Sequence, residues 1–146
     1  MLFRSHRVQR IGETGGVTFY DDSKATNPHA AVRAVSAFDS VVLLAGGLNK
    51  GLDLAALTTV EERIRAVVAF GDAAPEVEAA FAGRRPVETA SSMRDAVRRG
   101  ARLAQSGDVV LLSPGCASFD MYPGGYTERG DDFAAEVRTL IDEETR

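Results

Sequence analysis

Hydrophobic positions form short continuous runs in some parts of this chain and follow helical spacing in others. Nearly continuous apolar runs occupy residues 40–45, 66–70 and 108–112. Runs of this length, rich in valine and leucine, are typical of strands that are buried on both faces of a parallel sheet. A short run at 17–20, preceded by another at about 7–11, predicts two further strands near the N-terminus.

Helical spacing fills the intervals between these runs. Asn27 followed by Pro28 predicts a helix start, because asparagine caps free N–H groups and proline fits the first turn. Apolar stripes or helical composition then predict helices at 28–38, 53–63, 74–82, 93–104 and 133–141. This alternation of strands and helices predicts an α/β fold of three layers, in which helices flank a mostly parallel β-sheet.

The composition fits a single domain over residues 1–146. With 45% hydrophobic residues, the chain is able to bury a core. Its formal net charge of -4 gives no footprint for nucleic acid, and no apolar run approaches the roughly 20 residues that span a bilayer. The chain has one cysteine and no signal-peptide plan. We therefore expect a cytoplasmic protein without nucleic-acid or membrane partners.

Lysine is rare in this chain. Among the 17 residues that are Lys or Arg, only Lys24 and Lys50 are lysines, and both lie in loops rich in small residues. A lysine ammonium is a compact point charge on a flexible stem, whereas an arginine guanidinium is a planar fork. Our hypothesis is that these two positions need an ammonium that arginine does not replace.

Three loops follow predicted strands, at 21–28, 45–51 and 113–130. Ligands in α/β folds bind at the carboxyl ends of strands. The first loop places carboxylates, hydroxyls and an ammonium before a helix start, where free N–H groups favour anions. The second loop has two glycines, which let the backbone approach a ligand closely. The third loop has small residues near 117–119, where backbone N–H groups are able to form an anion-binding nest. Each loop, taken singly, also fits a purely structural connection.

Other reactive residue types give weaker signals. Cys116 has no second cysteine with which to pair and no histidine near it in sequence, so a packed thiol is favoured over a nucleophile. His6 and His29 are too far apart in sequence to suggest a metal pair. We predict no metal ligands in this chain.

Taken together, the loops resemble one family. The matching segments, in chain order, are His6-Arg7, Asp22-Ser23-Lys24-Ala25-Thr26-Asn27, Gly46-Gly47-x-x-Lys50-Gly51, Ser113-Pro114-x-x-Ala117-Ser118-x-Asp120 and Glu128-Arg129-Gly130-x-x-Phe133. Their order and spacing resemble the C-terminal domain of the Mur ligases, and most closely the members that add D-glutamate to UDP-N-acetylmuramoyl-L-alanine. The resemblance covers essentially the whole chain and implies a Rossmann-like domain, in agreement with the predicted fold.

The resemblance implies ATP-dependent amide formation. In this family ATP phosphorylates the carboxylate of UDP-N-acetylmuramoyl-L-alanine, with Mg²⁺ assisting, and the amine of D-glutamate attacks the resulting acyl phosphate. ATP and Mg²⁺ would be held mostly by a central domain. The resemblance assigns catalytic roles to Lys50 and Asp22, and it places Arg7 and Asp22 at the ATP.

The same resemblance assigns residues to D-glutamate, whose orientation would be fixed by separate groups on its two carboxylates. The α-carboxylate is assigned to Thr26 and Lys50, and the side-chain carboxylate to Ser118 and the backbone of Phe119. Tyr126 stands where the family has an aromatic residue that packs on the amino acid.

Ser23 and Lys24 are near enough in sequence to contribute to substrate binding as well. The chain has no Walker-type phosphate loop, so the resemblance implies that the N-terminal UDP-binding and central ATPase domains are absent. We expect the fragment to fold but to form no amide alone. Two alternatives stay open: another Mur or folylpolyglutamate-type ligase domain, and a non-catalytic Rossmann-like module that binds a nucleotide or a protein.

Overall fold

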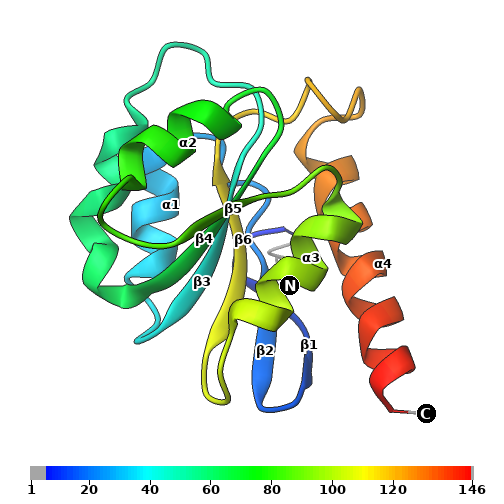
Figure 1. Cartoon of the computed structure of the whole chain (residues 1–146). Coiled ribbons are helices and arrows are strands. Elements are labelled where there is room, and N and C mark those ends of the chain that lie inside the picture. The colour runs from blue at the N-terminus through cyan, green and yellow to red at the C-terminus, as the bar shows by residue number, and fades with distance from the viewer. Residues whose placement is uncertain (1–5, 146) are drawn as a thin grey trace.

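Six strands form one sheet in residues 6–145, the part of the chain that this computed structural model describes (Figure 1). The strands are β1 (Gln9–Thr14), β2 (Val17–Asp21), β3 (Val41–Gly46), β4 (Ile64–Phe70), β5 (Val87–Thr89) and β6 (Val109–Gly115). Their order across the sheet is β1-β2-β6-β3-β4-β5. Because β1 is antiparallel to β2 and every other neighbouring pair is parallel, the prediction of a mostly parallel sheet is confirmed.

Helices cover both faces of this sheet. They are α1 (Pro28–Val35), the 3₁₀ helix η1 (Leu54–Arg63), α2 (Ala74–Phe81), α3 (Met93–Leu103) and α4 (Tyr126–Glu144). α1, η1 and α2 pack on one face, while α3 and α4 pack on the other (Figure 1). The predicted three-layer fold is therefore confirmed. Within the described residues, none of these helices has the length and apolar content needed to cross a membrane.

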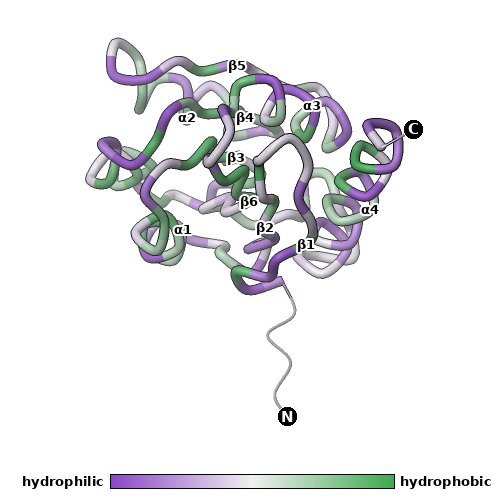
Figure 2. The backbone as a smooth tube through the Cα atoms, turned by 90° about the horizontal axis from the view of Figure 1, so that it is seen from below, coloured by the Kyte–Doolittle hydropathy of each residue, from purple (hydrophilic) through white to green (hydrophobic). Residues whose placement is uncertain are grey.

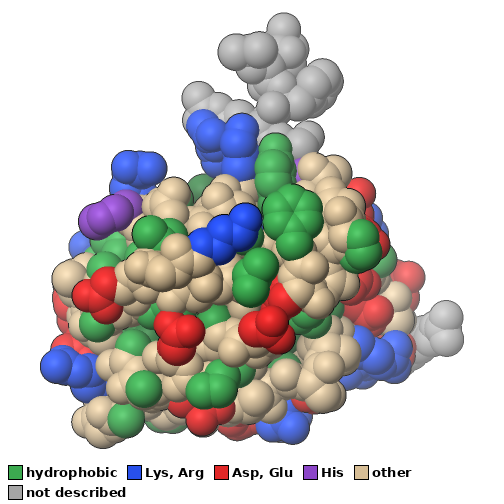
Figure 3. All heavy atoms as spheres, turned by 90° about the horizontal axis from the view of Figure 1, so that it is seen from above, with side chains coloured by type: hydrophobic (Ala, Val, Ile, Leu, Met, Phe, Trp, Pro, Cys, Tyr) green, Lys and Arg blue, Asp and Glu red, His purple; other side chains and the backbone are tan. Residues whose placement is uncertain are grey.

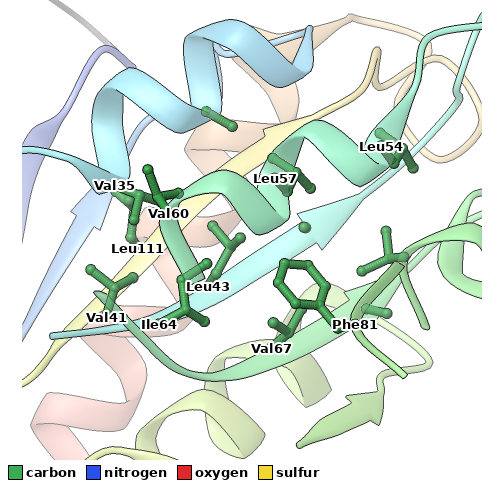
Figure 4. Close-up of a cluster of buried hydrophobic side chains, with 14 of the residues drawn as sticks. Val35, Val41, Leu43, Leu54, Leu57, Val60, Ile64, Val67, Phe81 and Leu111 are labelled. Atoms are coloured by element: carbon green, nitrogen blue, oxygen red, sulfur yellow. The ribbon is translucent and has the colours of Figure 1, made fainter. Parts of the chain in front are cut away.

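Strand β3 runs through the centre of the core. All its residues are buried, and their side chains alternate between the two faces of the sheet. Val41 and Leu43 belong to the cluster beneath α1, η1 and α2 (Figure 4), whereas Val42 and Leu44 belong to the cluster beneath α3 and α4. Seen from below, the central strands are hydrophobic and the surrounding helices have mixed hydropathy (Figure 2). The apolar run at 40–45 therefore predicted a strand that is covered on both sides.

Local caps set where helices begin. The side chain of Asn27 accepts a hydrogen bond from the N–H three residues further on (3.0 Å), as the sequence predicts for the start of α1. Asp53 caps the helix expected at 53–63 in a similar way. That helix is a 3₁₀ helix, in which the hydroxyls of Thr58 and Thr59 donate to carbonyls three residues earlier and favour the tighter turn.

The irregular segment expected at 113–130 is shorter in the structure. β6 continues to Gly115, which pairs with Gly46 of β3, and α4 begins at Tyr126. Only residues 116–125 therefore lack regular structure in this stretch. β5 was not predicted, because its three residues are too few to show a repeating apolar pattern.

Candidate functional site

Three loops meet at the carboxyl ends of β2, β3 and β6, at the upper end of the sheet in Figure 1. They are the first loop (22–27), the second loop (47–53) and the third loop (116–125). Leu48 and Ala117 exchange two backbone hydrogen bonds of 2.8 and 3.1 Å, which join the second loop to the third. The N–H of Gly115 donates to the carbonyl of Ala25 (2.9 Å), which joins β6 to the first loop. These contacts hold the three loops together.

A hollow of about 270 Å³, which we call the cationic hollow, lies beside the first loop. It is lined by Arg7, Val8, Asp22, Lys24, Ala25, Ala30, Arg33, Ala34 and Ala37. The basic side chains of Arg7, Lys24 and Arg33 outnumber the one carboxylate, so the hollow favours an anionic ligand. The sequence analysis did not identify Arg33, although its spacing from Ala30 puts both residues on one face of α1.

Asp22 lies in the wall of the cationic hollow with only 4% of its surface exposed. One carboxylate oxygen accepts the N–H of Val8 (3.1 Å) and the other accepts the hydroxyl of Ser113 (2.7 Å). Burial raises the pKa of Asp22, against the effect of these two hydrogen bonds. The carboxylate is thus fixed in position, with both oxygens already bonded to the protein.

Arg7 lies between two residues with left-handed backbone conformations, His6 (φ 63°) and Val8 (φ 45°). This region is strained for a β-branched residue such as Val8 and persists only where the surroundings enforce it. The carbonyl of His6 accepts the N–H of Lys24 (3.0 Å), and Nδ1 of His6 lies 2.6 Å from Oδ2 of Asp21. These contacts fix the segment around Arg7 against the first loop.

A second hollow, of about 380 Å³, opens between the three loops, and we call it the loop hollow. It is lined by Thr26, Leu48, Lys50, Leu52, Ala117, Phe119 and Tyr126. The structure thus brings together Thr26, Lys50, Phe119 and Tyr126, which the sequence analysis selected from three separate loops. Viewed from above, this end of the molecule has basic and hydrophobic side chains next to one another (Figure 3).

Lys50 supplies the positive charge at the loop hollow. Its Nζ lies 5.6 Å from the centroid of the Phe119 ring. Within residues 6–145 no carboxylate forms an ion pair with Lys50. Leu48 and Leu52, which sequence reasoning missed, give the hollow an apolar wall. The arrangement suits a small anion that has an aliphatic portion.

Three residues assigned to the substrate are not among those that line the loop hollow. Ser23 is fully buried, where its hydroxyl donates to the carbonyl of Tyr126 (2.7 Å) and accepts from Nε of Arg129 (2.9 Å). Ser118 is 2% exposed. Lys24 lines the cationic hollow instead of the loop hollow. Since none of the three lines the loop hollow, their roles at the substrate stay predictions.

Arg129 was part of the matched pattern but received no role from the sequence. Its guanidinium is fully buried, and burial lowers its pKa to about 10. It donates to the carbonyl of Ser23 (2.7 Å) and to the carbonyl of Cys116 (3.0 Å), as well as to the hydroxyl of Ser23. Arg129 therefore connects the first loop to the third loop from beneath the surface.

The two glycines of the second predicted loop, Gly46 and Gly47, have a packing role, and approach of their backbone to a ligand stays a prediction. A Cβ on Gly46 would collide with the carbonyl of Phe70, and a Cβ on Gly47 would collide with the carbonyl of Ala117. Both glycines have positive φ angles, of 144° and 119°. These glycines allow neighbouring backbone to approach closely. The expected nest is also incomplete, because the N–H of Ala117 already bonds to Leu48.

Cys116 is a packed thiol, as the sequence favoured. It is buried, and burial raises its pKa to about 11, so it carries little thiolate near neutral pH. In the part of the chain that the structure describes, no group of three or more His, Cys, Asp or Glu side chains is placed to hold a metal ion.

Comparison with known proteins gives consistent matches. Residues 6–116 match the family model described as Mur ligase, glutamate ligase domain. The chain is 49% identical over 137 residues to the UDP-N-acetylmuramoylalanine--D-glutamate ligase of Desulfosudis oleivorans, covering 92% of this chain and 30% of that protein. It is 48% identical over 138 residues to the ligase of the same name from Frankia casuarinae. That match covers 92% of this chain and 29% of that protein. The chain thus spans about 30% of the length of these curated relatives.

Solved structures share the fold at lower identity. The bifunctional folylpolyglutamate synthase/dihydrofolate synthase of Yersinia pestis, complexed with AMPPNP and a Mn ion, aligns with a TM-score of 0.64. The alignment covers 90% of this chain and 31% of that chain, at 20% sequence identity. At this identity the likeness concerns the fold alone.

Proposed function

The chain belongs to the Mur ligase family, and from this premise we propose that it is the D-glutamate-binding C-terminal domain of a ligase. In the proposed reaction, the amine of D-glutamate forms an amide with the alanyl carboxylate of UDP-N-acetylmuramoyl-L-alanine, which ATP has first activated as an acyl phosphate. The phosphate leaves as the amide forms. The product is a peptidoglycan precursor, and we place the activity in the cytoplasm.

The convergence of Thr26, Lys50, Phe119 and Tyr126 on the loop hollow carries this proposal. D-Glutamate has two carboxylates and a short aliphatic chain. The Lys50 ammonium and the Thr26 hydroxyl suit the α-carboxylate, and charge-assisted hydrogen bonds of this kind are the stronger ones. Tyr126 and the leucine wall suit the aliphatic chain. Holding the substrate in this way would orient its amine, so the gain in rate would come from positioning.

The cationic hollow fits the phosphates of ATP. Arg7 and Lys24 line it, and Arg33 adds a third positive charge. When bound, ATP supplies the phosphoryl group that activates the carboxylate. The bonded carboxylate of Asp22 fixes the backbone at Val8, and so places Arg7 at the hollow. We assign Mg²⁺ to no residue here, since residues 6–145 hold no group of three or more side chains suited to a metal.

The test is a titration of the ¹⁵N-labelled chain with D-glutamate, followed by chemical-shift mapping. We expect the signals of Thr26, Lys50 and Tyr126 to move together. Lys50→Ala should weaken D-glutamate binding about tenfold or more, because it removes a charged hydrogen-bond donor. Lys50→Arg should weaken binding too, since the planar guanidinium differs in shape from the ammonium. Arg138→Ala, on the exposed side of α4, is the control and should bind as the parent does.

The same titration separates the alternatives. L-Glutamate and L-lysine should bind more weakly than D-glutamate if the chain serves the proposed reaction. Preference for either of them would favour another ligase of the superfamily. Binding of AMPPNP with no preference among amino acids would instead favour a nucleotide-binding module, and unchanged D-glutamate binding in Lys50→Ala would contradict the role of Lys50.

A further inference from the structure

Phe119 exposes an aromatic ring where most aromatic side chains would be buried. Its side chain is 58% exposed, the highest value among the exposed large hydrophobic residues of the described chain. The resemblance uses only the backbone of this residue, so it leaves the ring without a role. An exposed ring at the edge of the loop hollow therefore calls for an explanation in terms of what it contacts.

The ring lies against a turn of the third loop. A Cβ placed on Gly125 would lie 3.5 and 3.6 Å from two atoms of the Phe119 ring, so the ring is next to the backbone there. The N–H of Gly125 donates to the carbonyl of Tyr122 (2.9 Å), and the N–H of Gly124 donates to the side chain of Glu128 (2.7 Å). The ring thus packs on backbone that is itself held by hydrogen bonds.

The backbone on either side of Lys50 is also held, while its side chain is long and flexible. The side chain of Asn49 bonds to both the N–H and the carbonyl of Leu52 (2.9 and 2.8 Å), and it donates to Glu76 (2.6 Å). The ammonium of Lys50 has the face of Phe119 at 5.6 Å, within the range of a cation–π interaction. Contact with the Phe119 ring is thus able to restrict the positions that the Lys50 ammonium takes.

We propose that the ring of Phe119 is a positioning residue, which holds the Lys50 ammonium at the loop hollow before a carboxylate arrives. A lysine side chain that is already ordered loses less freedom on binding, so the complex is more stable. The identity of the carboxylate ligand, D-glutamate, rests on the proposed function. The contact between ring and ammonium does not.

The chain itself provides a clean measurement, because Lys24 and Lys50 are its only lysines. Selective ¹³C labelling of lysine gives two sets of side-chain signals. The Phe119 ring should shift the ε-methylene protons of Lys50, and Phe119→Leu should remove that shift and leave Lys24 unmoved. Phe119→Tyr keeps the ring and should keep the shift. Because the side chain is exposed, both variants should fold, which unchanged amide spectra elsewhere would confirm.

Affinity for D-glutamate supplies the second readout. Phe119→Leu should weaken it about two- to fivefold, as expected for the loss of an exposed cation–π contact, and Phe119→Tyr should retain it. Equal affinity in Phe119→Leu and the parent, or a Lys50 signal that does not respond to loss of the ring, would overturn the proposal. If the parent chain binds no D-glutamate while the Lys50 signal still responds to Phe119, the proposed function fails and the ring contact stands.

Discussion

Arg129 shows how much of this site depends on residues that no ligand would touch. Its guanidinium is buried and bonds to backbone carbonyls of the first and third loops. Burial disfavours its charged form, which is why its pKa is lowered. The cost of burying this charge is offset by the hydrogen bonds that it makes, and those bonds fix the position of Ser23 and Cys116.

Arg129→Met should lower the free energy of unfolding by about 2–4 kcal/mol, because it leaves buried carbonyl groups without donors. Chemical denaturation measures this directly. Arg138→Met is the matched control on the exposed side of the same helix and should change stability by less than about 0.5 kcal/mol. Equal effects in the two variants would contradict a connecting role for Arg129.

At the scale of elements, local sequence signals predicted where helices and strands lie better than they predicted the type of helix. Asn27 and Pro28 predicted the start of α1, and the apolar run at 40–45 predicted β3, because capping and burial are written in neighbouring residues. The 3₁₀ form of η1 was not predictable, since apolar spacing alone does not distinguish the two helix types. The arginines of α3 form ion pairs with carboxylates of other elements, such as Arg98 with Glu143 of α4.

The packing of α4 against the N-terminal segment gives a prediction that opposes helix propensity. Gly130 lies within α4, where alanine would ordinarily stabilise the helix by about 1 kcal/mol. A Cβ at this position, however, would collide with the ring of His6 and would lie 2.7 Å from the carboxylate of Asp21. We therefore expect Gly130→Ala to destabilise the protein by about 1–3 kcal/mol in thermal or chemical unfolding.

Ala135→Gly calibrates this measurement, because Ala135 is exposed on the same helix and should report propensity alone. It should cost about 1 kcal/mol. A Gly130→Ala variant more stable than the parent would show that the close approach of His6 to α4 is not rigid.

At the scale of the whole molecule, the end of the sheet opposite the loops is held by charge. Asp108 precedes β6 and accepts hydrogen bonds from Arg65 of β4 (2.5 Å) and from the N–H of Gln105 (2.8 Å). β3 lies between β6 and β4, so this pair spans three strands. Burial acts to raise the pKa of Asp108, but the hydrogen bonds and the charge of Arg65 outweigh it and lower the pKa below its ordinary value of 3.8.

The sign of the pH effect follows from this lowered pKa. The carboxylate of Asp108 takes up a proton more readily in the unfolded chain than in the folded chain. The ionised carboxylate therefore stabilises the fold above pH 3.8, and this stabilisation is lost as the pH falls below that value. Asp108→Asn should therefore reduce stability at neutral pH and flatten the acid limb of a pH–stability curve. Asp39→Asn, which removes a fully exposed carboxylate, is the control for the loss of one negative charge.

The sequence motifs predicted which residues belong to the candidate site, but they did not predict that these residues divide between two hollows. The sequence placed Lys24 and Thr26 in one segment and suggested one substrate for both. In the fold Lys24 borders the cationic hollow and Thr26 borders the loop hollow. Which way a side chain points from an irregular loop depends on contacts with distant residues such as Arg129, and motif spacing carries no information about those contacts.

Ala25 and Thr26 are consecutive residues, yet they line different hollows. The first loop is therefore a wall that the cationic hollow and the loop hollow share. A ligand that restricts the remaining motion of the first loop from one hollow would leave less motion for a ligand in the other hollow to remove. Linkage requires each ligand to strengthen the other by the same factor. Under the proposed function, D-glutamate and ATP would therefore lie on opposite sides of one loop, and each would bind more tightly when the other is present.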